Sequence, residues 1–326
     1  MPPRAVYFNS HLRRRVRPAT LKRYATVLQR FLQFLAILDR PFYFGAISME
    51  NPGEALDDAL SVYADFGNIT RSVYCTTVSA VKFYYPAVRR SLSTADETLR
   101  GWAFADPSRH TMPCLRLHTL MLVAAAHEAG MLAAARGFLV QYAGYLRPGE
   151  LLRLTSSAVV LPEWCPDYVG SPRAFLILGT PERLTKVNRE EVVEITDPIG
   201  IAALRALVRT GSAQLVPLSA DRYRKAFQRA TAAAGLGALG ITPHSLRAGA
   251  ATQDSIDGVS FETIRARGRW RVESTARMYL AQANVLAQRA LVQTATLLAR
   301  GAPQLPPDLL DFDPLPARAA GEAPRR

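Results

Sequence analysis

The spacing of apolar residues changes once along this chain, and that change constrains its fold most. In the first half, apolar residues recur every three or four positions, as do Leu21, Tyr24, Val27 and Phe31, which is typical of amphipathic helices. In the second half, short runs rich in β-branched residues at 173–179 and 190–195 flank a polar loop with Pro181, which is typical of a hairpin. The sequence therefore predicts a mainly α-helical protein with a small β-hairpin or sheet.

The stretch around Trp102, Asp106, Pro107 and Pro113 lacks periodicity and is expected to be a loop between two domains. We therefore expect a basic N-terminal arm over residues 1–17, a helical domain over 18–110, an α+β domain over 111–300 and a disordered Pro-rich tail over 301–326. Helices are predicted at 18–38, 55–63, 71–83, 117–135, 130–145, 200–209, 220–234, 245–253, 261–267 and from 274 onward.

Positive charge is the main compositional signal. The chain has 40 Lys+Arg against 27 Asp+Glu, a net charge of +13, which favours double-stranded DNA or another nucleic acid as partner. No acidic residue occurs between Met1 and Leu38, where the candidate DNA contacts are Arg13, Arg14, Arg15, Arg17, Lys22 and Arg23. An Arg-rich transit peptide has a similar composition. The helical pattern continues from this segment without an obvious cleavage site, which favours the DNA-binding arm.

Several classes of protein are disfavoured. No apolar run of ~18 residues is present, so we expect no membrane contact, and no basic segment followed by an apolar one predicts secretion. The three cysteines, Cys75, Cys114 and Cys165, are far apart, which fits a reducing compartment. We therefore expect an intracellular protein, nuclear if eukaryotic and cytoplasmic or nucleoid-associated if bacterial. We expect neither a metal nor another cofactor.

Residues whose side chains could take part in catalysis occur at characteristic spacings in the second half of the chain. Arg147 precedes Glu150 by three residues, Lys186 lies in the predicted hairpin loop, and His244 precedes Arg247 by three residues at the start of a helix. Gly268, Arg269 and Trp270 follow, and Tyr279 comes nine residues after Trp270. An H-x-x-R pair alone is more often a solvated surface pair, but the ordered set is far more specific.

This order resembles the tyrosine recombinases, the phage-integrase family of enzymes that break and rejoin DNA. The resemblance covers roughly residues 113–300, and the helical N-terminal half is similar in size and basicity to the core-binding domain of that family. The family more often has His where Trp270 stands, although Trp is a known substitute. The Arg-Gly-Arg-Trp-Arg run suggests a eukaryotic mobile-element relative.

The resemblance implies a site-specific recombinase or integrase with six catalytic residues. Arg147 and Arg247 would make forked hydrogen bonds to the phosphate, and Tyr279 would form a 3′-phosphotyrosyl intermediate and release a 5′-hydroxyl without metal or ATP. Lys186 would protonate the leaving oxygen, and Trp270 would donate its indole N–H to a phosphoryl oxygen. His244 would either assist proton transfer at Tyr279 or bind the scissile phosphate. Glu150 would orient Arg147 or cap its helix, and Arg183 and Arg189 would contact the DNA backbone.

The resemblance also implies assembly of copies of the chain, as a dimer on one DNA site and a tetramer in synapsis. An amphipathic helix after Tyr279 could pack within its own chain or on a neighbouring protomer. Two alternatives remain at this point. One is an enzyme like the type IB topoisomerases, with the same chemistry but no exchange between sites. The other is a catalytically silent DNA-binding protein derived from a mobile element.

Overall fold

The computed structural model describes residues 16, 18–37, 52–105, 112–165, 170–179, 191–274, 276–277, 280, 285–288, 291, 294 and 305–316. The chain divides into two compact units, Met1–Arg109 and His110–Arg326. Within the described residues the fold is mainly helical with one three-stranded antiparallel sheet. The fold class predicted from the sequence is therefore confirmed.

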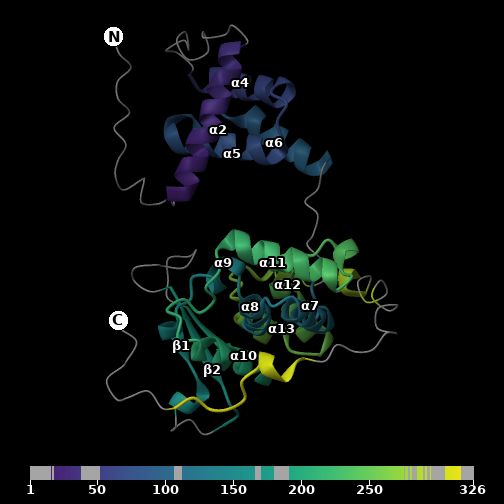
Figure 1. Cartoon of the computed structure of the whole chain (residues 1–326). Coiled ribbons are helices and arrows are strands. Elements are labelled where there is room, and N and C mark those ends of the chain that lie inside the picture. The colour runs from purple at the N-terminus through teal and green to yellow at the C-terminus, as the bar shows by residue number, and fades with distance from the viewer. Residues whose placement is uncertain are drawn as a thin grey trace. The chain divides into compact units, whose positions relative to one another are not determined.

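The first unit is a small helical bundle (Figure 1). Its helices are α2 (Pro18–Ile37), α4 (Pro52–Phe66), α5 (Arg71–Tyr84) and α6 (Ser93–Ala105), with a 3₁₀ turn η1 (Pro86–Arg90) before α6. Their apolar faces share one core, in which Phe31, Leu60, Tyr63 and Tyr74 are fully buried. The buried carboxylate of Asp57 on α4 accepts hydrogen bonds at 2.8 Å from the first-turn amides of α6, which satisfies donors that a helix start leaves unpaired.

The stretch around Trp102 differs from the sequence prediction. We expected a loop there, but Trp102 lies in α6 and its ring meets that of Tyr74 edge to face, with centroids 5.2 Å apart. This aromatic contact and the Lys82–Asp96 ion pair of 2.6 Å hold α6 against α5. Neither contact has a periodic signature that the sequence could show.

The second unit contains α7 (Arg116–Glu128), α8 (Leu132–Ala143), α9 (Pro148–Leu151), α10 (Pro198–Arg209), α11 (Ala220–Ala233), α12 (Pro243–Ile256) and α13 (Phe261–Gly268). Short 3₁₀ turns lie at Ser156–Ala158, Pro162–Trp164 and Gly237–Leu239. The continuous helix predicted over 117–135 is wrong, because the chain breaks between α7 and α8 at Gly130, where φ is 70°. Most of the helix predicted from Ser274 onward lies outside the described residues.

The sheet lies beside the helices of this unit (Figure 1). The predicted hairpin is present as β2 (Ala174–Leu178) and β3 (Glu191–Ile195), which pair antiparallel from Ala174↔Ile195 to Leu178↔Glu191. A two-residue strand, β1 (Val159–Val160), which the sequence did not predict, pairs with β2. Buried side chains of β2 and β3 share the main core with α8 and α10. The two strands are thereby packed against the helical body.

Residues 305–316 of the Pro-rich tail pack against the second unit, where the sequence analysis predicted disorder. This segment, which includes the 3₁₀ turn η5 (Pro307–Leu309), fully buries Leu309. Its carbonyl groups accept hydrogen bonds from Arg136, Arg205 and Arg209, and its acidic side chains pair with His127 and Arg209. Its aspartates thus pair with basic side chains and Leu309 enters the main core, a match that composition alone could not reveal. Residues 301–304 and 317–326 lie outside the described residues.

Among the described residues, none of the helices combines the length and apolarity needed to cross a membrane.

Candidate active site

The turn between α8 and α9 positions the first arginine. Tyr145 has a positive φ of 49°, which ends α8 and turns the chain so that Arg147 becomes the N-cap of α9. Pro148 occupies the first helical position, which suits its fixed φ, and Glu150 occupies the third. The Glu150 carboxylate accepts hydrogen bonds from the Arg147 backbone N–H at 2.8 Å and from its guanidinium at 2.5 Å.

Helix α12 positions His244 and Arg247 one turn apart on the same face. Its first turn is anchored from α8, because Gln141 Nε2 donates to the Pro243 carbonyl at 2.6 Å, and Gln141 in turn accepts from the hydroxyl of Tyr223 at 2.7 Å. The side chains of Gln141, Pro243 and Tyr223 lie in the interior or at its edge. The start of α12 is therefore fixed by buried polar contacts as well as by packing.

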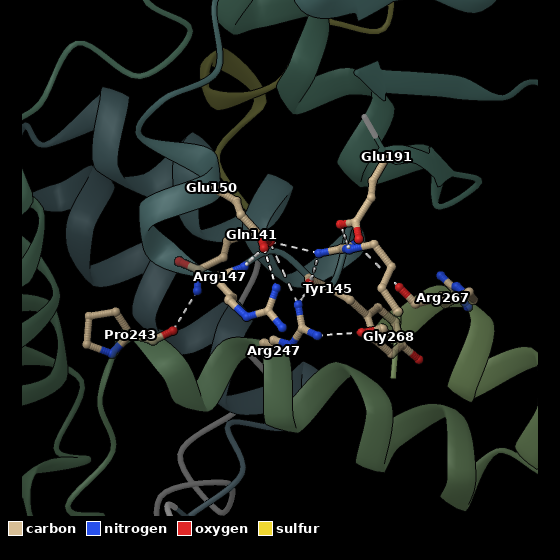
Figure 2. Close-up of polar contacts among 10 residues, drawn as sticks. Gln141, Tyr145, Arg147, Glu150, Glu191, Pro243, Arg247, Arg267 and Gly268 are labelled. Carbon is tan, nitrogen blue, oxygen red and sulfur yellow. Dashed lines mark hydrogen bonds and ion pairs between the residues drawn. The ribbon is translucent and has the colours of Figure 1, made fainter. Parts of the chain in front are cut away.

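Arg247 is nearly fully buried, with 6% of its surface exposed. Its guanidinium donates to the Tyr145 carbonyl at 2.7 Å and to the Gly268 carbonyl, and it lies 3.8 Å from Glu150 Oε2. Figure 2 shows Arg247 aimed from α12 toward Glu150 and Gly268. The planar fork of arginine suits contacts with several segments at once.

Glu150 lies at the centre of this arrangement, between Arg147 and Arg247 (Figure 2). It also accepts a hydrogen bond from Arg269 at 2.7 Å. Burial by itself would raise the pKa of the Glu150 carboxyl, but the charges of Arg269 and Arg147 and the hydrogen bonds from Arg147 outweigh burial and hold that pKa below its ordinary value. Glu150 is therefore ionised at neutral pH and keeps the arginines together.

His244 lies within the field of the same cluster. His244 is exposed on one side. The loss of water on its other side lowers the pKa of its imidazole, the positive charges of Arg247 and Arg147 lower it further, and Glu150 acts in the opposite direction. The net result is a pKa below 6.5, so the imidazole is mainly neutral at pH 7. A neutral imidazole can both accept and donate a proton, which suits a role in acid–base chemistry.

Trp270 completes the described part of the site. Its ring lies 5.5 Å from the Arg247 guanidinium carbon, and it packs beside a small core that contains Tyr145, Ile264 and Leu280. Gly268 has to be glycine, because a Cβ there would lie 2.1 Å from the Trp270 ring. In the Gly-Arg-Trp sequence, the glycine thus allows the Trp270 ring to pack on its backbone, and the same ring lies against Arg247.

Several predicted residues lie outside the described residues, namely Arg13, Arg14, Arg15, Arg17, Arg183, Lys186, Arg189 and Tyr279. Their neighbours in the sequence are informative. The loop that contains Lys186 starts after Leu178 and ends before Glu191, the final pair of the hairpin, and Glu191 Oε2 lies 3.4 Å from Arg269 Nε. Leu280, which follows Tyr279, is buried in the same small core as Tyr145. Glu191 and Leu280, the described residues next to these two segments, therefore lie beside the arginine cluster.

Basic side chains also lie on the surfaces of both units. Lys22 and Arg23, which we predicted as DNA contacts, are exposed on α2. The sequence analysis predicted the helix α11 but missed its basic exposed face, which carries Arg222, Arg224, Lys225 and Arg229. Three of these line a cavity of about 510 Å³ against the start of α8. The recurrence of basic residues at helical spacing over 222–229 is a signal that could have identified this surface.

The sequence analysis also missed Tyr145 and Arg269 as parts of the site. Both are non-glycine residues with positive φ, and no sequence pattern predicts this backbone conformation at a tyrosine or an arginine. Among the described residues, no group of three or more His, Cys, Asp or Glu side chains is placed to hold a metal ion.

Comparisons with known proteins show structural similarity without sequence similarity. No protein-family model matches the chain, and no curated protein does. Solved structures do match. The XerH site-specific recombinase, in a post-cleavage complex with palindromic difH substrate, aligns at a TM-score of 0.57 and 14% identity over 85% of this chain and 79% of its own. A lambda integrase dimer bound to a COC′ core site aligns at 0.54 and 16%, over 81% of this chain and 72% of its own.

The Tn1549 transposon integrase in complex with transposon right-end DNA also matches, at a TM-score of 0.51 and 12% identity, over 83% of this chain and 99% of its own. These similarities show that the chain has the fold of the site-specific DNA recombinases and integrases. The resemblance to tyrosine recombinases inferred from the sequence is thereby confirmed at the level of the fold.

Proposed function

We propose that this chain is a site-specific tyrosine recombinase that breaks and rejoins double-stranded DNA through a covalent 3′-phosphotyrosyl bond at Tyr279. The observation that carries this proposal is the cluster of Arg147, Arg247, His244 and Trp270 around Glu150 in a recombinase fold. Two fixed guanidinium groups can stabilise the charge that develops on the phosphoryl oxygens. Their supporting contacts come from three different segments, so the positions are set by the folded state.

The reaction divides among the residues as follows. The Tyr279 oxygen attacks the scissile phosphorus while the bond to the 5′-oxygen breaks, and Lys186 transfers a proton to that leaving oxygen. Arg147 and Arg247 bind the non-bridging oxygens, and the indole N–H of Trp270 adds a further donor. The neutral His244 takes up or returns the tyrosine proton. Reversal with a new 5′-hydroxyl rejoins the strand, so the phosphate ester bond energy is retained throughout.

The exposed basic side chains of α2 and α11 would bind the DNA backbone in this proposal. An intracellular location and assembly of copies on DNA belong to the same proposal. Their support is the net charge of +13 and the presence of a DNA-bound dimer among the structural neighbours.

The decisive experiment is covalent trapping on nicked duplexes made from the DNA that flanks the gene. The wild-type protein should form an adduct that survives denaturation, and Tyr279→Phe should form none while binding the same duplex, because only one hydroxyl is removed. Tyr85→Phe, at an exposed tyrosine of the first unit, is the matched control and should form the adduct normally. An adduct in Tyr279→Phe, or none with the wild-type protein on any flanking duplex, would contradict the proposal.

A second experiment tests the leaving-group assignment. Lys186→Ala should cleave an ordinary duplex slowly but a duplex with a 5′-bridging sulfur at a near-normal rate, because sulfur leaves without a proton. Arg247→Ala should be slow on both substrates, because the charge on the phosphoryl oxygens is unchanged. Equal rescue of the two variants would mean that the roles are wrongly assigned.

A further inference from the structure

Arg269 lies in a backbone conformation that its side chain does not favour. Its φ and ψ are 54° and 37°, at the position just after α13, where helices commonly end in glycine. Tyr145 has the same unusual sign of φ. Of the three non-glycine residues with positive φ in the described chain, these two meet, since Arg269 donates to the Tyr145 carbonyl at 3.3 Å. Strained residues of this kind cluster at functional sites.

The Arg269 side chain is buried between two carboxylates. Only 10% of it is exposed, and it lies 2.7 Å from Glu150 Oε2 and 3.4 Å from Glu191 Oε2. The first contact has hydrogen-bond geometry, and the second is an ion pair at longer range. Because Glu191 begins β3, Arg269 joins the hairpin to the turn of Arg147.

The same side chain also acts on Arg247. The Tyr145 carbonyl accepts from Arg247 at 2.7 Å and from Arg269, so both guanidinium groups are fixed by one oxygen. The backbone carbonyl of Gly268, the residue before Arg269, is a second acceptor for Arg247. A change at position 269 should therefore alter the position of Arg247 through two carbonyl groups, those of Tyr145 and Gly268.

We propose that Arg269 is a positioning residue that neutralises Glu150 and fixes the Tyr145 carbonyl, so that Arg147 and Arg247 are held ready for the scissile phosphate. The inference rests on the proposed function. Three arginines and two glutamates give this cluster one excess positive charge. Removal of Arg269 leaves no excess, and the Glu150 carboxylate then competes with the phosphate for both remaining arginines. The loss should appear in the chemical step, since the Arg269 guanidinium is held by Glu150, Glu191 and the Tyr145 carbonyl and acts on the phosphate only through the other two arginines.

Arg269→Gly is an informative variant because glycine suits the backbone and only the side chain is removed. Single-turnover cleavage should slow by about 10- to 100-fold, while the DNA dissociation constant changes by less than about threefold. Arg269→Lys should recover part of the rate. Asn68→Gly, at the other non-glycine residue with positive φ, is the matched control and should cleave normally.

A second substitution separates electrostatics from general destabilisation. Adding Glu191→Gln to Arg269→Gly restores the single excess positive charge and should raise the cleavage rate at least threefold over Arg269→Gly alone. A residue that only supports the fold would show no such recovery. A wild-type rate in Arg269→Gly, or a further loss in the double variant, would overturn the inference.

A readout without DNA keeps this inference separate from the proposed function. In protein labelled with ¹³C at glutamate Cδ, the Glu150 signal can be assigned by its disappearance in Glu150→Gln. Its pKa should lie below the ordinary glutamate range in the wild-type protein and rise in Arg269→Gly. If the wild-type protein cleaves no DNA, the proposed function fails and this titration still decides the charge relation. A Glu150 pKa in Arg269→Gly equal to that of the wild-type protein would refute the inference that Arg269 neutralises Glu150.

Discussion

Replacing Arg247 by lysine tests whether the geometry of the guanidinium, beyond its charge, is required. In the folded protein, two arms of this group reach carbonyl oxygens of separate segments, those of Tyr145 and Gly268. A lysine ammonium presents its three donors from one nitrogen and cannot reproduce a planar fork. We therefore expect Arg247→Lys to fold but to hold its charge in the wrong place.

The magnitude follows from the hydrogen bonds that the substitution removes. At least one hydrogen bond to a charged group disappears, which contributes about 1.5–3 kcal/mol, and this converts to a rate loss of roughly 10- to 150-fold. The measurement is single-turnover formation of the covalent complex at saturating protein, on a flanking duplex that the wild-type protein cleaves. The unfolding temperature of the variant should fall as well, because a buried carbonyl group loses its hydrogen-bond donor.

Arg205→Lys is the matched control. Arg205 is also largely buried and makes a forked contact with a carboxylate, that of Glu163, at 3.0 Å. It lies beside the tail, which no part of the proposed chemistry uses. Arg205→Lys should lower stability and leave the cleavage rate unchanged. A wild-type cleavage rate in Arg247→Lys, or an equal loss in Arg205→Lys, would refute the reasoning.

Three further outcomes are expected. The cleavage rate should decrease in the order wild type, Trp270→His, Trp270→Phe, Trp270→Ala. In Trp270→Phe the activation free energy should rise by about 1–3 kcal/mol, because the indole donor is lost. A Phe variant as fast as the wild type would make the residue purely structural. Leu309→Ala should reduce the free energy of unfolding by about 2–5 kcal/mol in thermal or denaturant melts, whereas Phe312→Ala, at an exposed position, should have little effect. Burial lowers the pKa of His118 to about 4 in the folded protein. As the pH falls below about 6.5, His118 is therefore protonated in the unfolded chain before it is protonated in the folded one. The free energy of unfolding should decrease by up to about 3 kcal/mol between pH 6.5 and pH 4. In urea melts at pH 6.5 and pH 5, that decline should shrink in His118→Asn, and an unchanged slope would show that His118 is not its source.

The sequence predicts those features that depend on short-range spacing. Arg147 and Glu150 are three residues apart at a helix start, and so are His244 and Arg247, so each pair shares a face whatever the tertiary structure. The hairpin follows from two β-branched runs around a polar loop. The ordered set of motifs then indicated the fold by resemblance, and the structural comparisons agree.

The features that the sequence did not reveal depend on tertiary contact. Arg269 looks like one more arginine in a basic run until the fold places Glu150 and Glu191 on either side of it. Tyr145 resembles a core aromatic, yet its function in the site comes from its carbonyl and its positive φ. The tail has the composition of a disordered segment, but a specific basic surface binds it. Composition and periodicity carry no information about such partners.

The contact between Cys114 and α12 has a mechanical consequence. The backbone N–H of Cys114 donates to the Ser245 carbonyl at 2.9 Å, and a Cβ at position 249 would lie 1.7 Å from the Cys114 carbonyl oxygen. The backbone at Cys114 is therefore in direct contact with the helix that carries His244 and Arg247, and the absence of a Cβ at Gly249 permits this close packing. A force that displaces the backbone at Cys114 therefore acts directly on the helix that carries Arg247.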